Sequence, residues 1–462
     1  MATDKHGIWK KDKDHFIHPY TDFSTFRDEG SQVITGGSGA YIEDIDGNKY
    51  LDGIAGLWCV NIGHGRKEMA DAISAQVTSL QYYNPFGHTT NVPAAELAER
   101  LANICPSNLN HVFYSTGGST ANDTAVRIVH HYFNRRGQYK KKKIISRMDA
   151  YHGSTYFAAT LTGIHGTKDG FDGVGDYVDY VSPANMYRKP TQMSSTEYCD
   201  YLVIEFENRI LQIGPDNVAA FIAEPIMGAG GVLVAPDGYH KRMYDICKKY
   251  DMLYISDEVV TAFGRLGAMI ASEDVFGVRP DIICLAKGIT SGYIPLGATM
   301  ISDEIYEVIA TPQSVGGALT MGFTYSGHAV ACAAALKNIE ILENEGICGH
   351  VKQQGPGLLS QLSSLSSYSM VGDVRGSHFM IGLELVEDRA SKKGFDVTVG
   401  SATRVFEACR DRGLIVRPIG NIIVISPPLT LTENDCSNLY SILDESLADV
   451  SNDLVGEGFL AA

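Results

Sequence analysis

Residues 281–288 read Asp-Ile-Ile-Cys-Leu-Ala-Lys-Gly, a short apolar run that ends on Lys287 and is followed by glycine. A second run, Met-Leu-Tyr-Ile-Ser at residues 252–256, ends on Asp257. Apolar runs of this length are typical of buried strands. Burying a single charge at a strand tip is costly unless the charge finds a partner. We therefore expect Lys287 and Asp257 to meet around a bound group.

Similar runs recur through the middle of the chain, separated by stretches long enough for a helix. The six runs are residues 111–115, 143–148, 219–224, 252–256, 281–286 and 297–301. Continuous apolar strands that alternate with helices predict an α/β fold with a mostly parallel sheet covered on both faces. Ligands of such sheets bind beyond the carboxyl ends of the strands, where Asp257 and Lys287 both lie.

The N-terminal part of the chain has a different pattern. Residues 41–45 and 49–51 flank Asp-Gly-Asn, which predicts a hairpin with a tight turn. The Gly-Gly-Ser-Gly stretch at residues 36–39 is interpreted as a loop. Residues 69–80 have the spacing of an amphipathic helix, and Pro93 opens another helix.

Composition and charge exclude several classes of protein. The chain of 462 residues is 44% hydrophobic and 20% charged, as in an ordinary globular protein, and can form two or more domains. Its formal net charge of −16 argues against nucleic acid or an anionic membrane as the main partner. The lysine run at residues 140–143 is interpreted as a solvated loop rather than an anion patch.

The nine cysteines include no C-x-x-C pair, so we expect reduced thiols and neither a disulfide framework nor a metal site. The charged residues near the N-terminus have no apolar stretch behind them. No signal peptide or membrane span is therefore expected, and the predicted location is cytoplasmic.

Residues 115–120, Ser-Thr-Gly-Gly-Ser-Thr, follow one predicted strand and open a helix. A turn of this kind presents free N–H groups and the positive end of the helix dipole, which suits a phosphate. The same turn could also serve only to cap the helix. It matches neither the P-loop pattern nor the G-x-G-x-x-G dinucleotide fingerprint.

Tyr151-His152-Gly153 comes just beyond the strand at residues 143–148, and Glu224 adds an acid at the same edge of the sheet. The Tyr151 ring could stack on a planar cofactor or simply pack in the core. Pyridoxal phosphate (PLP) needs an amine for a Schiff base and a carboxylate for its pyridinium nitrogen. Lys287 and Asp257 supply this pair.

These motifs together resemble the class III aminotransferases from about residue 25 to the C-terminus. The matching segments are Tyr151-His152-Gly153, Ala223-Glu224-Pro225, Ser256-Asp257-Glu258-Val259, Phe263-Gly264-Arg265, Ala286-Lys287-Gly288 and residues 322–328. Residues 56–61 and Arg417-Pro418 look most like the amine–pyruvate and diamine–pyruvate branch.

The resemblance implies PLP-dependent transferase fold type I, with a mostly parallel seven-stranded sheet domain and a smaller α+β domain. We divide the chain into an N-terminal segment (1–60) that packs with the small domain, a large PLP-binding domain (61–325) and a C-terminal small domain (326–462).

The resemblance also implies a role for each matching residue. Lys287 would hold PLP as a Schiff base and carry protons, and Asp257 would keep the pyridine nitrogen protonated. Cofactor-binding residues would further include Gly118, Ser119, Tyr151, His152, Glu224, Val259 and, from the second subunit of a homodimer, Thr324. Substrate-binding residues would be Trp58, Phe86, Tyr151 and Arg417, although packing is the alternative for Trp58 and Phe86. Arg417 would pair with a substrate carboxylate and swing away for uncharged amines.

Three positions depart from the family pattern. Gly117 replaces a serine at the phosphate turn, Met227 stands where glutamine is common, and Ala229 stands where the ornithine and 4-aminobutyrate enzymes carry glutamate. Backbone N–H groups remain at Gly117, so phosphate binding should survive. The absence of the glutamate argues against the mode of substrate selection used by those enzymes.

The function implied is transfer of an amino group to a keto acid, with pyruvate giving alanine, by a ping-pong mechanism. The donor stays open among diamines, aliphatic or aromatic amines and ω-amino acids, and dimer versus tetramer stays open as well. A racemase, mutase or decarboxylase of the same family is the alternative, and a PLP-binding protein without turnover is the remote one.

Overall fold

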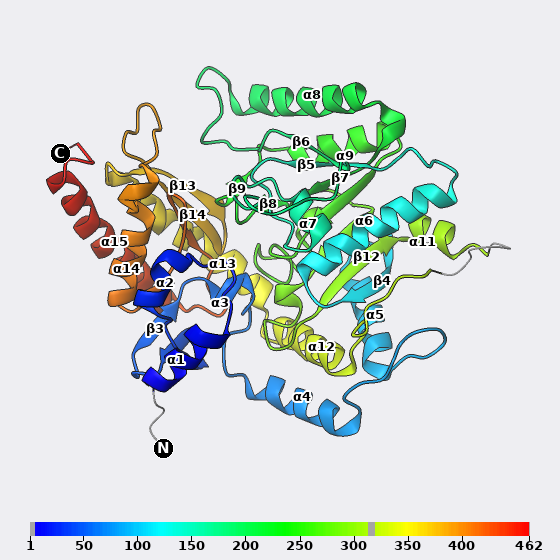
Figure 1. The fold of residues 1–462 in the computed structure, drawn as a ribbon, viewed down its shortest axis with the longest axis horizontal. Coiled ribbons are helices and arrows are strands. Elements are labelled where there is room, and N and C mark those ends of the chain that lie inside the picture. Colours follow the sequence, from blue (N-terminus) through cyan, green and yellow to red (C-terminus); the bar gives the residue numbers. More distant parts are fainter. Residues whose placement is uncertain (1–4, 313–318, 462) are drawn as a thin grey trace.

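The structure is a computed structural model that describes residues 5–312 and 319–461. Its centre is a seven-stranded sheet in the order β4-β12-β11-β10-β7-β5-β6, on the right in Figure 1. Neighbouring strands run parallel except β12, which is antiparallel to both β4 and β11. The strands are β4 (Leu109–Ser115), β5 (Lys143–Arg147), β6 (Val178–Val181), β7 (Val218–Ala223), β10 (Leu253–Asp257), β11 (Ile282–Leu285) and β12 (Gly297–Ser302).

Successive side chains of a strand point to opposite faces of the sheet. Because both sets are apolar here, helices pack on both faces. Ile282 and Cys284 pack in one apolar cluster with α6 (Gly118–Arg135). Ile283 and Leu285 pack in another with residues of α5 (Val92–Ile104) and α12 (Ala329–Asn344). Toward β5 and β6, that second face is covered by α8 (Ser195–Ile213) and α9 (Tyr239–Lys249). The shorter helices α7 (Tyr156–Leu161), α10 (Ala271–Asp274) and α11 (Asp303–Ala310) complete this part.

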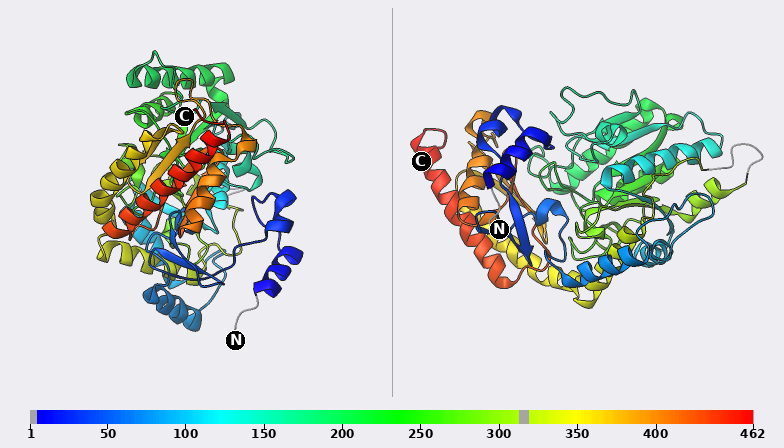
Figure 2. Two further views of the ribbon diagram at one scale, coloured as in Figure 1. Left: turned by 90° about the vertical axis from the view of Figure 1, so that its left-hand side faces the viewer. Right: turned by 60° about the horizontal axis from the view of Figure 1, so that its bottom comes forward.

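The N-terminal residues form two helices and a small sheet. These elements are α1 (Lys5–His15), α2 (Phe23–Glu29), β1 (Ile34–Ser38), β2 (Tyr41–Asp44) and β3 (Lys49–Asp52). β3 also pairs in parallel with β15 (Leu414–Ile415), so strands from distant parts of the chain lie side by side. In both views of Figure 2 the blue N-terminal part lies beside the orange and red C-terminal helices. α3 (Ala55–Trp58) and α4 (Lys67–Ser79) then lead into the large sheet.

The C-terminal residues build a four-stranded antiparallel sheet in the order β13-β14-β17-β16, backed by helices. The strands are β13 (Val371–Ser377), β14 (Met380–Leu385), β16 (Arg417–Ile419) and β17 (Ile422–Ile425), and the helices are α13 (Ile347–Ser363), α14 (Ser401–Asp411) and α15 (Glu433–Gly456). A two-stranded ribbon, β8 (Ile226–Met227) with β9 (Leu233–Val234), lies between the two sheets. In the described ranges, no helix combines the length and apolar character that a membrane crossing needs.

The structure confirms the fold class, the six predicted strands and the hairpin, and corrects three details. Residues 36–38, expected in a loop, belong to strand β1. β6 was not predicted, because Val-Asp-Tyr-Val is too short to stand out as an apolar run. Lys141, expected in a solvated loop, is buried, and its Nζ donates to the carbonyls of Tyr250 and Asp251 at 2.9 and 2.7 Å.

Candidate active site

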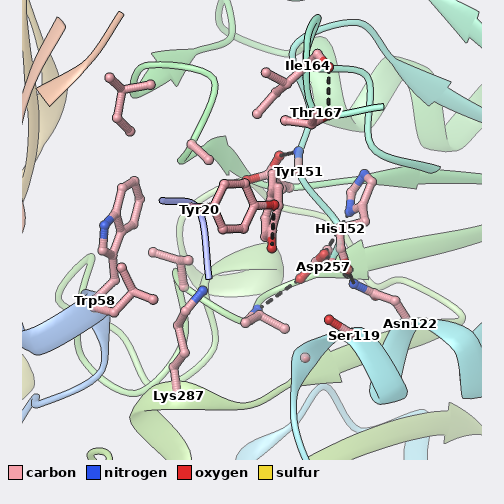
Figure 3. A pocket seen from close by; sticks show the side chains of 18 of the residues that line it. Tyr20, Trp58, Ser119, Asn122, Tyr151, His152, Ile164, Thr167, Asp257 and Lys287 are labelled. Carbon is pink, nitrogen blue, oxygen red and sulfur yellow. Dashed lines mark hydrogen bonds and ion pairs between the residues drawn. The ribbon is translucent and has the colours of Figure 1, made fainter. Parts of the chain in front are cut away.

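The tips of β10 and β11 bring Lys287 and Asp257 to one cavity. The two strands are parallel, with Asp257 opposite Cys284, so the backbone leaves both strands at the same edge of the sheet. Lys287 begins a 3-10 helix, Lys287–Ile289, with a φ of +48° that turns the chain sharply. The cavity has a volume of about 620 Å³ and is seen from close by in Figure 3. Its walls include Tyr20, Trp58, Ser119, Asn122, Tyr151, His152, Ile164, Thr167, Asp257, Lys287 and Arg417.

The Asp257 carboxylate is buried and held by three hydrogen-bond donors. Its Oδ2 accepts from Asn122 Nδ2 at 2.7 Å and from His152 Nδ1 at 2.7 Å, and its Oδ1 accepts from the backbone N–H of Val259 at 3.1 Å. We assign the proton of His152 to Nδ1 because its partner is a carboxylate. The three donors fix the direction of the carboxylate and leave Oδ1 able to face a ligand.

Lys287 lies in surroundings that favour the neutral amine. Burial is the largest influence and lowers the pKa of Lys287 below the usual 10.5, opposed by the nearby carboxylates of Asp257 and Glu224. Because the neutral amine is the nucleophilic form, the lowered pKa prepares Lys287 for attack on a carbonyl.

The N-terminus of α6 opens onto the same cavity. The N–H groups of Thr116 and Gly117 are taken by Thr120 Oγ1, at 3.2 and 3.1 Å. The first N–H groups of a helix have no intrahelical partner, which leaves those of Gly118 and Ser119 for an anion. Gly118 has no room for a side chain, because a Cβ there would lie 2.9 Å from Val259 Cγ1. The backbone at Gly118 and Ser119 thus packs closely against Val259 and can bind an anion through its N–H groups.

Glu224 positions Tyr151. Its Oε1 accepts from the Tyr151 N–H at 3.1 Å and its Oε2 accepts from the Gly228 N–H at 2.8 Å. Burial raises the pKa of Glu224, while the nearby His152 and the hydrogen bond from the Gly228 N–H act in the opposite direction. Burial also raises the pKa of Tyr151 to about 12, so its phenol stays neutral.

The mouth of the cavity is formed by Tyr20, Trp58 and Arg417, which come from three distant parts of the chain. The Trp58 ring is buried against Gly228, where a Cβ would lie 2.4 Å from the indole. Tyr20 donates a hydrogen bond of 3.4 Å to the Tyr151 hydroxyl and meets its ring edge-on, as Figure 3 shows. Burial lowers the pKa of Arg417, and among the described residues no carboxylate forms an ion pair with it.

The structure brings most of the predicted site residues together, with two exceptions. Gly118, Ser119, Tyr151, His152, Glu224, Asp257, Val259, Lys287, Trp58 and Arg417 all line the cavity. Phe86 lies elsewhere, against Gly322, and Thr324 is exposed, with its carbonyl accepting from Tyr82 at 2.8 Å. One chain alone therefore does not place Phe86 or Thr324 in this cavity.

Sequence reasoning missed Tyr20 and the role of Asn122. Asn122 lies one turn into α6, a position that follows the phosphate turn and could have been searched for polar side chains facing the sheet. Tyr20 has no comparable signal, because it lies in the irregular segment between α1 and α2.

The donors that line the cavity suit PLP. A buried amine faces the cavity with a lowered pKa, a fixed carboxylate can meet a pyridinium nitrogen, and a helix N-terminus can bind a phosphate. The Tyr151 and Val259 side chains line the space between these three groups. The volume of about 620 Å³ leaves room for a small substrate beside the cofactor.

Comparison with known proteins gives consistent matches over almost the entire chain. The family model described as Aminotransferase class-III matches residues 26–447. The putrescine–pyruvate aminotransferase of Pseudomonas aeruginosa is 41% identical over 444 residues, which cover 95% of this chain and 96% of the relative.

Two solved structures have the same fold throughout. A thermostable (S)-enantioselective omega-transaminase from Thermomicrobium roseum superposes with a TM-score of 0.94 at 40% identity, covering 97% of this chain and 99% of the other. The omega transaminase from Pseudomonas jessenii, solved in complex with PMP, has a TM-score of 0.94 at 37% identity, with coverage of 98% and 99%.

Proposed function

The chain belongs to the class III aminotransferases and is a PLP-dependent enzyme, and from this premise we propose that it transfers the amino group of an amine donor to pyruvate, giving alanine. The observation that carries the choice of a keto acid is Arg417, a guanidinium at the cavity mouth that pairs with no carboxylate among the described residues. A guanidinium binds a carboxylate through two parallel hydrogen bonds. The likeness to a putrescine–pyruvate aminotransferase supports pyruvate in particular.

The protein's own residues have separate tasks in this proposal. Bound PLP supplies an electron sink for the negative charge that develops at the substrate's α-carbon. Asp257, fixed by Asn122 and His152, holds a proton on the pyridine nitrogen through its carboxylate. Lys287 Nζ would move the proton from the α-carbon of the donor to the C4′ carbon of the cofactor, and in the second half-reaction from C4′ to the carbonyl carbon of the acceptor.

The phosphate and the ring of the cofactor are held by the remaining residues. Gly118 and Ser119 offer the N–H groups at the start of α6 to the phosphate. Tyr151 and Val259 would lie on either side of the ring, and Glu224 fixes the backbone of Tyr151. His152 and Glu224 thus act through other residues, although both line the cavity.

The cavity walls favour a donor with an apolar body. Leu57, Ile164, Ile226, Val260 and Ile419 line the cavity, and the acids among its walls are Asp257 and Glu224, both already bound. A second ammonium group of a diamine would therefore meet the Tyr20 and Tyr151 rings and their hydroxyls rather than a carboxylate. Ala229 also lines the cavity and adds no charge to these walls.

The test is a spectral titration of the PLP-loaded protein. Butylamine or putrescine alone should convert the bound cofactor to pyridoxamine phosphate, and pyruvate should then restore the first spectrum with one alanine formed per site. Initial rates at several concentrations of both substrates should give the parallel double-reciprocal lines of a ping-pong mechanism. Cofactor that stays unchanged with every amine, or alanine that never forms, would contradict the proposal.

The assembly, the domain division and the cellular location belong to the same proposal. We propose a homodimer in which Thr324 completes the phosphate site of the partner and Phe86 lines its substrate pocket, supported by the exposure of both residues in one chain. The division into 1–60, 61–325 and 326–462 is supported by the pairing of β3 with β15. All nine cysteines are free thiols, which supports a reducing compartment such as the cytoplasm.

A further inference from the structure

A second cavity, of about 720 Å³, adjoins the catalytic one. It lies between the segment that joins α1 to α2 and the region of α7 with the loop that follows it. Tyr20, Gly153 and Thr167 line both cavities, so the two spaces share a wall.

The walls of this second cavity are mainly apolar, although they lie at the surface. Ile17, Pro19, Phe23, Tyr156, Ala159 and Phe171 line it without lining the catalytic cavity. Tyr156 and Phe171 are 67% and 81% exposed, which is unusual for large apolar side chains gathered at one place.

The charged side chains of the second cavity do not form a site for an ion. His165, Lys168 and Asp172 are exposed, and Lys168 Nζ is bound to the Tyr180 hydroxyl at 2.5 Å and to the Thr160 carbonyl at 3.2 Å. His18 is bound to Asp12 at 2.9 Å. What the cavity offers to a ligand is therefore mainly a hydrocarbon surface, with Asp172 as its exposed acid.

Tyr20 lies between the two cavities and is held there by one weak hydrogen bond. Its hydroxyl bond to Tyr151 is long, at 3.4 Å, and its backbone has a φ of +52°, which is unfavourable for a residue with a side chain. A small rotation of this exposed ring exchanges one weak hydrogen bond for a hydrogen bond to water. The wall between the cavities can thus open at little cost.

We infer that the second cavity binds the hydrocarbon tail of a long-chain aliphatic amine whose amino group lies beside Lys287 in the catalytic cavity. The inference rests on the proposed transamination, and it defines the donor class more narrowly. The shared wall sets the direction of the tail, the apolar lining sets its chemistry, and the absence of a free carboxylate in the described walls of the catalytic cavity disfavours a second ammonium group.

The experiment compares kcat/KM for unbranched amines from butylamine to dodecylamine, with pyruvate as the acceptor. Each methylene that becomes fully buried should raise kcat/KM up to about fourfold, so the series should climb after the catalytic cavity is filled. A series that is flat or falls beyond hexylamine would overturn the inference while leaving the transamination intact. Failure with butylamine as well would instead contradict the proposed function.

Two variants locate the effect. Tyr156→Asp places a carboxylate at the first residue of α7, where a negative charge suits the helix dipole and the fold should be unaffected. Ala159→Phe fills the second cavity from the same helix. Both should leave butylamine turnover unchanged and lower kcat/KM for decylamine about tenfold or more, since several buried methylenes are lost.

The matched control is Tyr139→Asp, at a tyrosine that is 70% exposed in a loop that lines neither cavity. It should leave the whole amine series unchanged. If decylamine loses nothing in Tyr156→Asp and Ala159→Phe, or if Tyr139→Asp lowers it equally, the tail does not lie in the second cavity.

Discussion

Asp257, at the floor of the catalytic cavity, receives three hydrogen bonds from its neighbours, whereas Arg417, at the mouth, pairs with no carboxylate among the described residues. The floor is defined here as Asp257, Lys287, Asn122 and His152. These residues come from the end of β10, the 3-10 helix after β11, the start of α6 and the loop after β5, all within one sheet domain. The mouth, defined as Tyr20, Trp58 and Arg417, comes from the N-terminal segment, α3 and β16.

The difference separates two requirements of the reaction. Both half-reactions move a proton at the same atoms of the cofactor, so the floor gains from groups that are already oriented. The mouth must accept an amine in one half-reaction and a carboxylate in the other. Tyr20, with one weak hydrogen bond, and Arg417, with no carboxylate partner among the described residues, can change position between the two at small cost, whereas Trp58 is packed against Gly228.

The largest effect is expected at the floor, from Lys287→Ala. Removing the amine that carries the proton should lower kcat on the order of 10⁴-fold. The matched control is Lys141→Met, which removes another buried lysine, at the far side of the sheet domain, where Nζ binds backbone carbonyls. Lys141→Met should lower the unfolding temperature but keep the specific activity of the folded protein. Equal activity losses in both would mean that Lys287 has no chemical role.

Asp257→Asn should have the next largest effect. The amide keeps the shape of the side chain but loses the charge that holds the pyridine nitrogen protonated, which should lower kcat on the order of 10²-fold. Asp281→Asn is the control, because Asp281 is also buried, accepts from the Tyr254 N–H at 2.8 Å and lies at the opposite end of β11. A loss of stability without a comparable loss of kcat in Asp257→Asn would contradict its assignment.

Arg417→Ala tests the mouth. The KM for pyruvate should rise roughly 10- to 100-fold, because a charge-assisted hydrogen-bond pair is lost, while the KM for butylamine should change little. Arg404→Ala, at a surface arginine bound to Glu457 at 2.9 Å, is the control and should change neither constant. Equal increases in both KM values would remove the carboxylate-binding role and, with it, the contrast between floor and mouth.

The floor was predictable from the sequence, because its key residues end two apolar strands and meet at the edge that a parallel sheet offers to ligands. The resemblance to a known family then placed Tyr151, Val259 and Arg417. Asn122 was within reach of the same reasoning, since it lies in the helix that follows the phosphate turn.

The mouth could not be predicted in the same way. Tyr20 approaches Tyr151 across 131 residues of chain from an irregular segment, and no periodicity or spacing records that contact. The prediction of a solvated loop was wrong at Lys141 for a related reason. A run of lysines predicts solvent exposure, and only the fold shows that three backbone carbonyls surround the Lys141 ammonium group. Where the position of a side chain depends on contacts between distant parts of the chain, the local sequence pattern carries little information about that position.

The smallest effect is expected from Tyr20→Phe. The variant removes one hydroxyl from an exposed side chain whose hydrogen bond to Tyr151 measures 3.4 Å, so the loss should be about 0.5 kcal/mol, or about twofold in kcat/KM for butylamine. Tyr151→Phe is the informative partner, because it removes the same bond together with that to Ser154 Oγ at 3.1 Å. If the Tyr20 hydroxyl acts only through its hydrogen bond to Tyr151, the double variant should lose no more kcat/KM for butylamine than Tyr151→Phe alone. Both single changes break that one shared bond. A tenfold loss in Tyr20→Phe would mean that its hydroxyl contacts the reacting atoms, and Tyr20 would then belong with the floor.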